Sequence, residues 1–477
     1  MTILDQIVDT KRKEIIQWYA KYQLDALRLA CQPAQDATPE FYRRIAETKA
    51  KGQPFFIAEF KRKSPSEGWI YQDADLPAQI RAYASSGASA ISVLTDYPYF
   101  GGSYEDLKAA RAVLDTIPHP PLLLQKEFIL DPLQIYLAKL AGADLILLIA
   151  AILSPEMLEA LRLTAESIGL GVLVEVHDAE ELEQIQHLPF PVLGVNNRDL
   201  KTFRTSLNRV NTLKEKAIGR YIIAESGVLD HRHFQMVRRA DGFLIGTGLM
   251  RPGTALVKSF TDHFQHEGKW LFKACGIRTE PLLATSSADW LGINFSPRSK
   301  RRLSPEALEA MKPVDLSRLV AVFHQNTFEE IEAILARFPF KTIQLYAGDV
   351  SPEQVRRLKV RVLLAIKTPQ EQTPETIMDT LVEPYAADVD CFILDSATPG
   401  GGTRIQSELP GHFPYPFLLA GGLHEDNLEL ATQYPNCIGV DIASGIETDG
   451  VVDFEKIRRI GERLASLPLL HDISNCF

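Results

Sequence analysis

Cysteine is scarce in this chain, and the few residues present form no recognisable pattern. Five cysteines are scattered over 477 residues, with no CxxC pair among them. An odd number without paired spacing indicates neither a disulfide framework nor a zinc site. A reducing cytoplasm is therefore the expected location.

Long apolar runs and an excess of basic residues are also missing. The most apolar stretch, residues 145–153, is far shorter than the roughly 20 residues that cross a bilayer. Residues 1–20 lack an apolar core followed by a small-residue cleavage site, so they do not resemble a signal peptide. A net charge of −10 argues against a nucleic-acid partner but leaves local anion sites open. We expect neither a membrane nor a nucleic-acid partner.

Short apolar runs rich in β-forming residues alternate with helical patterns from Phe55 onward, which indicates βαβ units and a parallel sheet. Eight runs precede the polar segment "QHEGK", and eight more follow it. We therefore predict domains at 1–262 and 269–477, joined by a linker at 263–268. The predicted strands are 55–61, 90–96, 121–128, 143–151, 171–177, 191–199, 221–227 and 242–248, then 270–277, 289–296, 318–325, 342–348, 361–368, 391–397, 416–423 and 437–444.

Two series of eight strands predict an α/β chain of two tandem (β/α)₈ TIM barrels, since one such barrel takes about 250 residues. Doubly wound open sheets are the alternative architecture. They usually have fewer strands and carry a glycine-rich fingerprint after the first strand, which this chain lacks.

Polar residues stand at the ends of several predicted strands in the first half. Glu59 and Lys61 are two residues apart, so both side chains leave the strand on the same face. Active sites of TIM barrels lie at these carboxyl ends. A structural salt bridge would explain any one such charge as well, but the repetition favours a cluster for proton transfer. The other strand-end residues are Lys126, Glu175, Asn196, Arg198, Glu225 and Ser226.

The last two strands of the first half end in small residues, in "ESGV" and "LIGTGLM". Small residues let backbone N–H groups approach an anion, and the loops after strands seven and eight of such barrels commonly hold a phosphate. Either loop alone is weak support, because turns use glycine freely. Together they predict a phosphorylated substrate.

The motifs "IAEFKRKSPSEG", "SVLTDYPYFGGS", "LQKEFILDPLQIYLAKLAGADLILLI", "LVEVH", "GVNNRDL", "IAESGV" and "FLIGTGLM" resemble indole-3-glycerol phosphate synthase over residues 1 to 260. The family closes the ring of a carboxyphenylamino deoxyribulose phosphate with loss of carbon dioxide and water, and the resemblance implies no cofactor and no metal. The amphipathic segments "LDQIVDTKRKEIIQWY" and "TPEFYRRIAET" resemble its N-terminal helical extension over the barrel mouth, as a cap on apolar surface or as part of the substrate site.

The resemblance also assigns roles. It makes Lys126 the general acid for the substrate ketone, Glu175 the acid/base of the dehydration, and Lys61 the partner of the anthranilate carboxylate. Positioning of the substrate is expected from Glu59, Asn196, Arg198 and Glu225. The phosphate is expected at Ser64, Ser226, Gly227, Gly246 and Thr247.

The second half carries Cys275 at the end of its first strand. A lone buried cysteine is more often inert packing. Lys273 lies two residues earlier on the same face, however, and the opposite charge of a nearby ammonium favours a thiolate, which raises the odds that Cys275 is catalytic.

The motifs "FKACGI", "GINFSPRSKRRLSPE", "AVFHQ", "FILDSATPGGGT", "LLAGGLHEDN" and "GVDIASGIE" resemble phosphoribosylanthranilate isomerase over residues 268 to 465. That family performs an Amadori rearrangement whose product is the substrate of the first half. The resemblance makes Asp395 the general acid, Cys275 the general base and Arg301 the group that orients the anthranilate. The phosphate is expected at Gly421, Gly422, Ser444 and Gly445.

Two departures from the isomerase pattern leave alternatives open. Tyr346 stands where the family usually has histidine, and the loop at 400–411 lacks the usual aromatic–acid pair. The second half could be a docking or stabilising module without catalysis. A sugar-phosphate aldolase or epimerase is a further alternative, but it needs a Schiff-base lysine or a metal cluster. We expect phosphorylated anthranilate derivatives as partners, and a monomer.

Overall fold

The computed structural model describes residues 2–31, 38–198, 204–229, 231–250, 270–279, 287–311, 316–368, 372–396 and 409–468. By its internal contacts the chain divides into two compact units, Met1–Thr205 with Leu213–His266, and Ser206–Thr212 with Glu267–Phe477. The predicted linker at 263–268 and most of the 400–411 loop lie outside the described residues, so the exact domain bounds stay a prediction.

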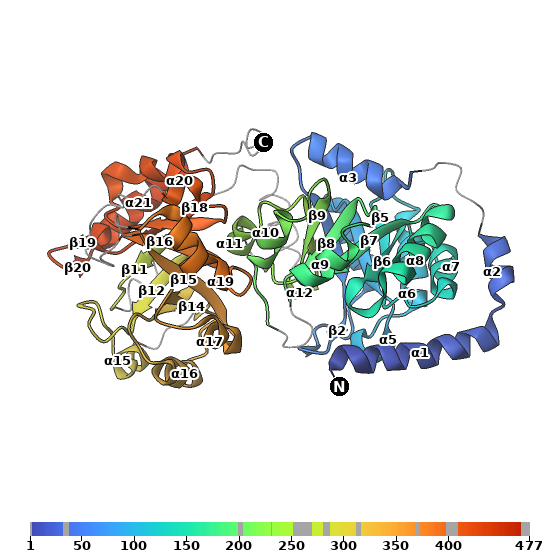
Figure 1. Ribbon diagram of the computed structural model, residues 1–477, viewed down its shortest axis with the longest axis horizontal. Coiled ribbons are helices and arrows are strands. Elements are labelled where there is room, and N and C mark those ends of the chain that lie inside the picture. The colour runs from blue at the N-terminus through green and yellow to red at the C-terminus, as the bar shows by residue number, and fades with distance from the viewer. Residues whose placement is uncertain are drawn as a thin grey trace. The chain divides into compact units, whose positions relative to one another are not determined.

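The first unit contains a closed barrel of eight strands in the order β1-β10-β9-β8-β7-β6-β5-β4 (Figure 1). Every neighbouring pair is parallel; Ile57, for example, is in register with both Ala90 and Leu244. The strands are β1 (Phe55–Phe60), β4 (Ala90–Leu94), β5 (Leu122–Lys126), β6 (Leu145–Ile149), β7 (Gly171–Val176), β8 (Val192–Asn196), β9 (Tyr221–Glu225) and β10 (Gly242–Ile245). All eight predicted strands of this half are confirmed.

The second unit contains a second closed barrel, in the order β11 to β18. Its strands are β11 (Leu271–Cys275), β12 (Trp290–Asn294), β13 (Leu319–Val322), β14 (Thr342–Tyr346), β15 (Arg361–Thr368), β16 (Cys391–Ser396), β17 (Phe417–Ala420) and β18 (Cys437–Ile442). The predicted fold class, two tandem (β/α)₈ barrels, is confirmed.

Helices connect successive strands, and several begin where the sequence offers a capping residue. Asp131 caps α7 by accepting a hydrogen bond from the Leu133 amide, and Thr327 caps α16 in a reciprocal capping box with Glu330. The helices that follow the strands of the first barrel are α4 (Leu76–Ser85), α5 (Tyr97–Phe100), α6 (Tyr104–Leu114), α7 (Pro132–Leu140), α8 (Pro155–Ser167), α9 (Ala179–Ile185), α10 (Arg209–Lys214), α11 (His231–Met236) and α12 (Thr247–Met250); residues 209–212 of α10 are grouped with the second unit. The described helices of the second unit are α15 (Pro305–Ala310), α16 (Phe328–Arg337), α17 (Pro352–Arg357), α18 (Pro374–Ile377), α19 (Glu383–Ala386), α20 (Leu409–His412) and α21 (Phe454–Ser466).

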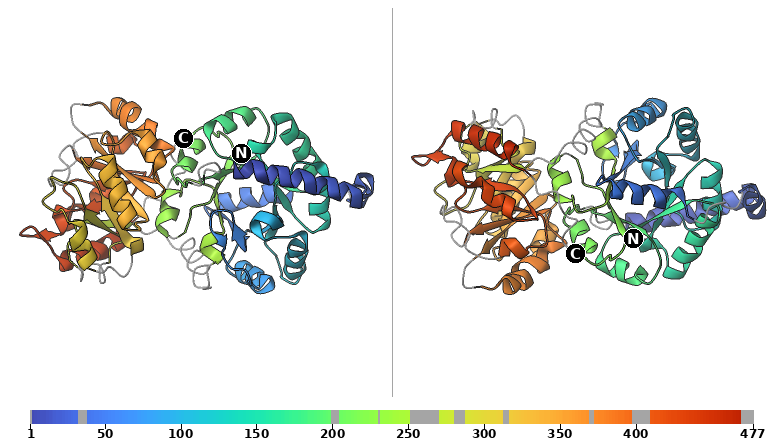
Figure 2. Two further views of the ribbon diagram at one scale, coloured as in Figure 1. Left: turned by 90° about the horizontal axis from the view of Figure 1, so that it is seen from below. Right: turned by 90° about the horizontal axis from the view of Figure 1, so that it is seen from above.

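Three helices precede the first barrel: α1 (Ile3–Lys21), α2 (Leu24–Ala30) and α3 (Glu40–Ala50). Buried Lys11 on α1 contacts Asp96 and Glu127, which follow β4 and β5, so α1 lies at the carboxyl ends of the strands. Figure 2, which shows the chain from two other directions, also places α1 against this barrel.

The expectation that both amphipathic segments cover the barrel mouth is wrong for α3, which lies at the opposite end of the strands (Figure 1). The Phe41 ring lies 5.6 Å from that of Phe55, the first residue of β1. A side chain at Gly171, the first residue of β7, would meet the Phe41 Cβ at 2.6 Å. Phe41 and Ile45 are one helical turn apart and fully buried, so they close the amino end of the barrel.

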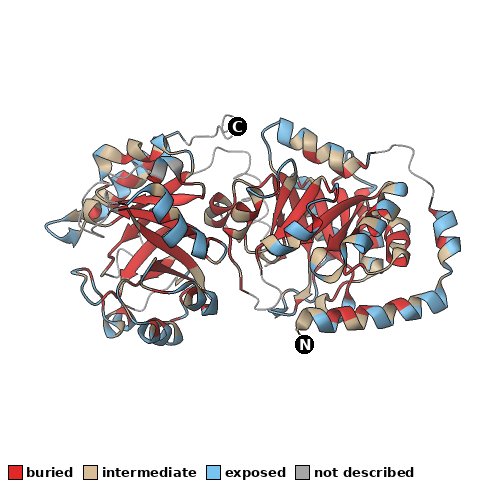
Figure 3. Cartoon of the chain, viewed as in Figure 1, coloured by how far each residue is buried: buried red, intermediate tan, exposed pale blue. Residues whose placement is uncertain are grey.

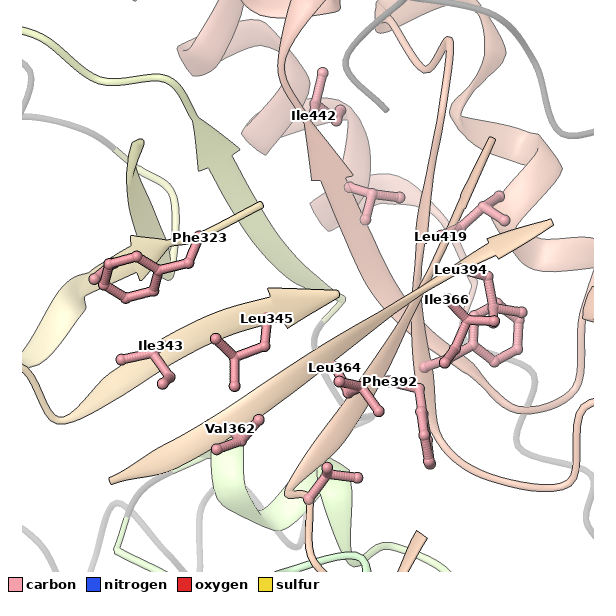
Figure 4. Close-up of a cluster of buried hydrophobic side chains, with 14 of the residues drawn as sticks. Phe323, Ile343, Leu345, Val362, Leu364, Ile366, Phe392, Leu394, Leu419 and Ile442 are labelled. Carbon is pink, nitrogen blue, oxygen red and sulfur yellow. The ribbon is translucent and has the colours of Figure 1, made fainter. Parts of the chain in front are cut away.

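Both barrels bury their strands and expose the outer faces of many helices (Figure 3). Figure 4 shows part of the second core, in which side chains of neighbouring strands pack together, among them Ile343, Leu364 and Leu394. This close packing fixes the strand ends that carry the polar residues. None of the described helices has the length and apolar character that crossing a membrane requires.

Candidate active sites

Lys126, the last residue of β5, reaches across the mouth of the first barrel. Its Nζ donates to Glu175 Oε2 at 2.8 Å and to Glu225 Oε2 at 2.6 Å. These carboxylates stand on β7 and β9, two and four strands away around the ring of eight. Three of the predicted residues therefore meet in one hydrogen-bonded cluster, and an ammonium and two carboxylates in contact can exchange protons.

Glu175 has two further neighbours. Asn196 donates from Nδ2 to Glu175 Oε1 at 3.0 Å, as expected of a predicted site residue. His177 places Nε2 3.2 Å from the same oxygen, and its Nδ1 lies 3.2 Å from Glu181 Oε2. His177 was not singled out from the sequence, although its spacing of two from Glu175 already put both side chains on one strand face.

The contacts in this cluster shift the pKa values of Lys126, Glu175 and Glu225 by different amounts and in different directions. Burial opposes the charge on Lys126, but the carboxylates of Glu175, Glu225 and Glu59 outweigh it and raise the pKa of Lys126. For Glu175, burial is outweighed by Lys126 and His177, which hold its pKa well below the usual range. For Glu225, burial prevails, with repulsion from Glu175 in support, and raises its pKa to about 7. Two carboxylates with divergent pKa values are typical of acid/base sites.

Glu59 and Lys61 bind each other at the end of β1, with Lys61 Nζ 2.7 Å from Glu59 Oε1. A side chain at Gly246 would collide with Glu59 Oε1 and come within 3.1 Å of Lys61 Nζ. Gly194 likewise leaves room for Glu225, whose Oε1 any Cβ at that position would strike. Gly194 was missed from the sequence, because a glycine in a strand does not reveal which side chain it accommodates.

The other predicted residues of the first barrel lie near this cluster or in its loops. Arg198 donates from Nη1 to Ser66 Oγ at 2.6 Å, in the loop after β1. Ser64 is buried, and its Oγ accepts from the Glu67 amide at 3.2 Å. Ser226 and Gly227 both have positive φ, 64° and 84°, so the backbone turns sharply in the loop directly after β9.

The second barrel has a cavity of about 500 Å³ at the carboxyl ends of its strands. A volume of this order suits a small organic ligand. All but one of the predicted site residues of this half line it, namely Cys275, Arg301, Asp395, Gly421, Gly422 and Ser444. Gly445, the remaining one, packs against the Leu423 carbonyl, where a side chain would not fit.

Lys273 is fully buried and forms an ion pair with Asp441. Its Nζ donates to both carboxylate oxygens of Asp441 at 2.9 Å. Burial raises the pKa of the Cys275 thiol, and the opposing attraction of Lys273 does not compensate. Lys273 thus lowers the pKa of Cys275 as expected, but burial, supported by the negative charge of Asp441, outweighs it.

Asp395 and Arg301 each have a partner that sequence reasoning missed. Tyr346 donates its hydroxyl to Asp395 Oδ2 at 3.0 Å. Arg301 binds Glu447 in a bidentate pair, Nε to Oε1 at 2.6 Å and Nη2 to Oε2 at 2.8 Å. Glu447 follows β18, far from Arg301 in sequence, so no local signal could have paired them.

Among the residues that the structure describes, no group of three or more histidine, cysteine, aspartate or glutamate side chains is arranged to hold a metal ion.

Comparison with known proteins also divides the chain between the first barrel and the second. The family model for indole-3-glycerol phosphate synthase matches residues 4–259, and the model for N-(5'-phosphoribosyl)anthranilate isomerase matches residues 273–463. The tryptophan biosynthesis protein TrpCF of Helicobacter pylori is 31% identical, over 89% of this chain and 92% of that one. The chain belongs to this bifunctional family.

Two more relatives agree with this assignment. TrpCF of Buchnera aphidicola is 30% identical over 97% of this chain and 99% of its own length. The multifunctional tryptophan biosynthesis protein of Schizosaccharomyces pombe is 32% identical over 88% of this chain, which spans only 60% of that longer protein. The first barrel is thus the synthase half and the second the isomerase half.

Proposed function

We propose that the two halves catalyse consecutive reactions at the two sites described. The isomerase half converts N-(5-phosphoribosyl)anthranilate to 1-(2-carboxyphenylamino)-1-deoxyribulose 5-phosphate. The synthase half then closes the indole ring of that aminoketose, with loss of carbon dioxide and water, to give indole-3-glycerol phosphate. The observation that carries the proposal is that each barrel brings its own acid, base and glycine loops to the carboxyl ends of its strands.

In the isomerase half, Asp395 gives its proton to the ring oxygen while the bond from that oxygen to C1 breaks. The ring opens to a protonated imine, whose positive charge acidifies the hydrogen on C2 and favours the thiolate of Cys275. Cys275 removes that proton, and the resulting enol rearranges to the aminoketose. This order explains how a thiol with a raised pKa can serve, because the cation arises only after the acid has acted.

Binding in the isomerase half follows from the residues that surround the cavity. Arg301 orients the anthranilate, and Glu447 holds the guanidinium in place before the substrate arrives. Gly421 and Gly422 line the cavity without side chains that would block it, so their N–H groups can approach the phosphate, with Ser444 and Gly445 from the next loop.

In the synthase half, Lys126 protonates the ketone as the aromatic carbon attacks it, and Glu175 serves as acid/base in the dehydration. Lys61 holds the anthranilate carboxylate. Substrate is positioned by Glu59, Asn196, Arg198 and Glu225, and phosphate by Ser64, Ser226, Gly227, Gly246 and Thr247. The raised pKa of Lys126 keeps it an ammonium, which suits an acid and disfavours the neutral amine that a Schiff-base aldolase needs.

A docking module without catalysis remains the second candidate for the isomerase half. It is favoured by the departures at Tyr346 and at 400–411. Against it, Cys275, Arg301 and Asp395 still line one cavity. We further propose that the domains are 1–262 and 269–477 with a linker at 263–268, and that the chain is a cytoplasmic monomer with small-molecule partners only.

The test supplies the purified chain with the aminated ribose phosphate and, separately, with the aminoketose. Consumption of both, with indole-3-glycerol phosphate as the final product, supports the proposal. Consumption of the aminoketose alone would leave the isomerase half as a docking module.

A further inference from the structure

Tyr346, the last residue of β14, lies in the isomerase cavity and contacts the proposed general acid. Its hydroxyl donates to Asp395 Oδ2 at 3.0 Å, and both residues are only 6% exposed. Asp395 stands on β16, with β15 between the two strands. A buried hydrogen bond to a carboxyl group fixes the plane of that group and favours its charged form.

The Tyr346 ring is itself held by its neighbours. The His324 ring lies 4.3 Å from it between centroids, and His324 Nδ1 lies 2.7 Å from Asp349 Oδ2. The Lys367 ammonium lies 5.8 Å from the centroid of the Tyr346 ring. The hydroxyl therefore cannot turn away from Asp395 without disturbing contacts made by two other strand ends.

We propose that Tyr346 is a positioning residue for the isomerisation, which orients the Asp395 carboxyl and stabilises the charge it acquires. This inference rests on the proposed isomerase function. When the O–H bond of Asp395 breaks and the sugar oxygen takes the proton, a negative charge appears on the carboxylate. The Tyr346 hydroxyl, already in place, needs no rearrangement to stabilise it.

Tyr346 keeps its own proton throughout this step. Burial, followed by the charges of Asp395, Asp441 and Cys275, raises its pKa well above the ordinary value. The hydroxyl is thus a donor at any working pH, and Asp395 alone supplies the transferred proton. Because Tyr346 acts through Asp395, its loss should lower turnover rather than substrate affinity.

The experiment compares two tyrosines of the same barrel. Tyr346→Phe removes the hydroxyl that binds Asp395. Tyr385→Phe removes a hydroxyl that donates to the Val350 carbonyl at 2.6 Å and accepts from the Gly348 amide at 3.5 Å. Each change therefore deletes hydrogen bonds of one tyrosine hydroxyl, and the Tyr385 change is expected to cost at least as much stability as the Tyr346 change. We expect Tyr346→Phe to lower the isomerase kcat by about 10-fold or more, with KM within about threefold, because a charge-assisted bond is lost. Tyr385→Phe should leave both constants near wild type.

A double variant separates positioning from an independent role. In an Asp395→Asn background, Tyr346→Phe should cause no further loss, because the group it acts through is gone. If Tyr346→Phe lowers kcat by the same factor in the Asp395→Asn background as in wild type, or leaves kcat unchanged in wild type, the Tyr346 inference is overturned while the proposed isomerase function stands. An unmodified chain without isomerase activity would overturn the proposed isomerase function as well. Ring closure by the same preparations controls for the amount of intact chain, and circular dichroism with thermal unfolding of each variant shows whether the isomerase half is folded.

Discussion

The Nζ atom of Lys126 lies 2.6 Å from Oε2 of Glu225, four strands away around the first barrel. The proposed acid of the synthase half is thus held by a carboxylate that faces it across the mouth. Glu225 fits there because Gly194, on the neighbouring strand β8, leaves room for its Oε1.

Adding one methyl group beneath each site should disable one reaction and spare the other. Gly194→Ala would displace the flexible end of Glu225 and so lower ring closure. Gly292→Ala would place a Cβ 2.8 Å from Cys275 Sγ and lower isomerisation. We expect each variant to lose at least about 10-fold in its own kcat/KM, measured for both reactions. Equal loss of both activities in one variant would contradict the separation of the sites.

His177 should make the free energy of unfolding of the synthase half depend on pH. Burial opposes its charge, but bonds to Glu175 and Glu181 raise its pKa from 6.5 to about 10. Its stabilising contribution is therefore complete below pH 6.5 and is lost as the pH rises to about 10. Urea unfolding of wild type and His177→Asn should differ by a few kcal/mol at pH 6, and this gap should shrink at pH 9 to 10. Exposed His187→Asn should show no such gap. A gap that stays constant with pH would show that His177 is not charged.

Lys11 should anchor α1 to the strand ends beside Lys126. Its Nζ lies 2.7 Å from Glu14, 3.2 Å from Asp96 and 3.0 Å from Glu127, and it is 1% exposed. Lys11→Met leaves the two buried carboxylates unpaired and should cost about 3–5 kcal/mol in the free energy of unfolding. Lys13→Met, on the exposed face of α1, should cost almost nothing.

A second substitution should restore part of the stability that Lys11→Met loses. Adding Glu127→Gln to Lys11→Met removes one of the unpaired charges and should recover part of the lost stability, measured by denaturant unfolding. If the double variant is less stable than Lys11→Met alone, the ion cluster is not what holds α1.

Cys275→Ser should stop the isomerisation while leaving the cavity intact. Serine has nearly the same size, but its hydroxyl is far less acidic than a thiol and cannot serve as the base. We expect the isomerase kcat to fall on the order of 10²- to 10⁴-fold, with ring closure unchanged. An active Cys275→Ser chain would assign the base to another residue.

The sequence predicted both barrels because strand length, β-branched residues and capping chemistry recur with each βα unit. It could not place α3, since Phe41 and Ile45 reveal an apolar face but not the end of the barrel that the face covers. The strand-end residues were predictable from the architecture, which brings every carboxyl end to one rim.

Side-chain contacts within each barrel between residues far apart in the sequence could not be predicted in the same way. The bonds from Lys126 to Glu225, from Lys273 to Asp441 and from Arg301 to Glu447 join distant parts of the sequence. The pKa of Cys275 is raised first by burial and then by the charge of Asp441, which together outweigh Lys273. The local pattern gave the sign of the Lys273 contribution but not the raised pKa that results from burial.

The most direct test of two separate, consecutive sites is a complementation assay with two full-length variants, Lys126→Ala and Asp395→Asn. Each is supplied with N-(5-phosphoribosyl)anthranilate alone and then in a mixture, and indole-3-glycerol phosphate is measured. Lys126→Ala should accumulate the aminoketose, Asp395→Asn should leave the substrate unchanged, and the mixture should make the indole product. A mixture that makes none, although Asp395→Asn still closes the ring of added aminoketose and wild type completes both steps, would contradict the account.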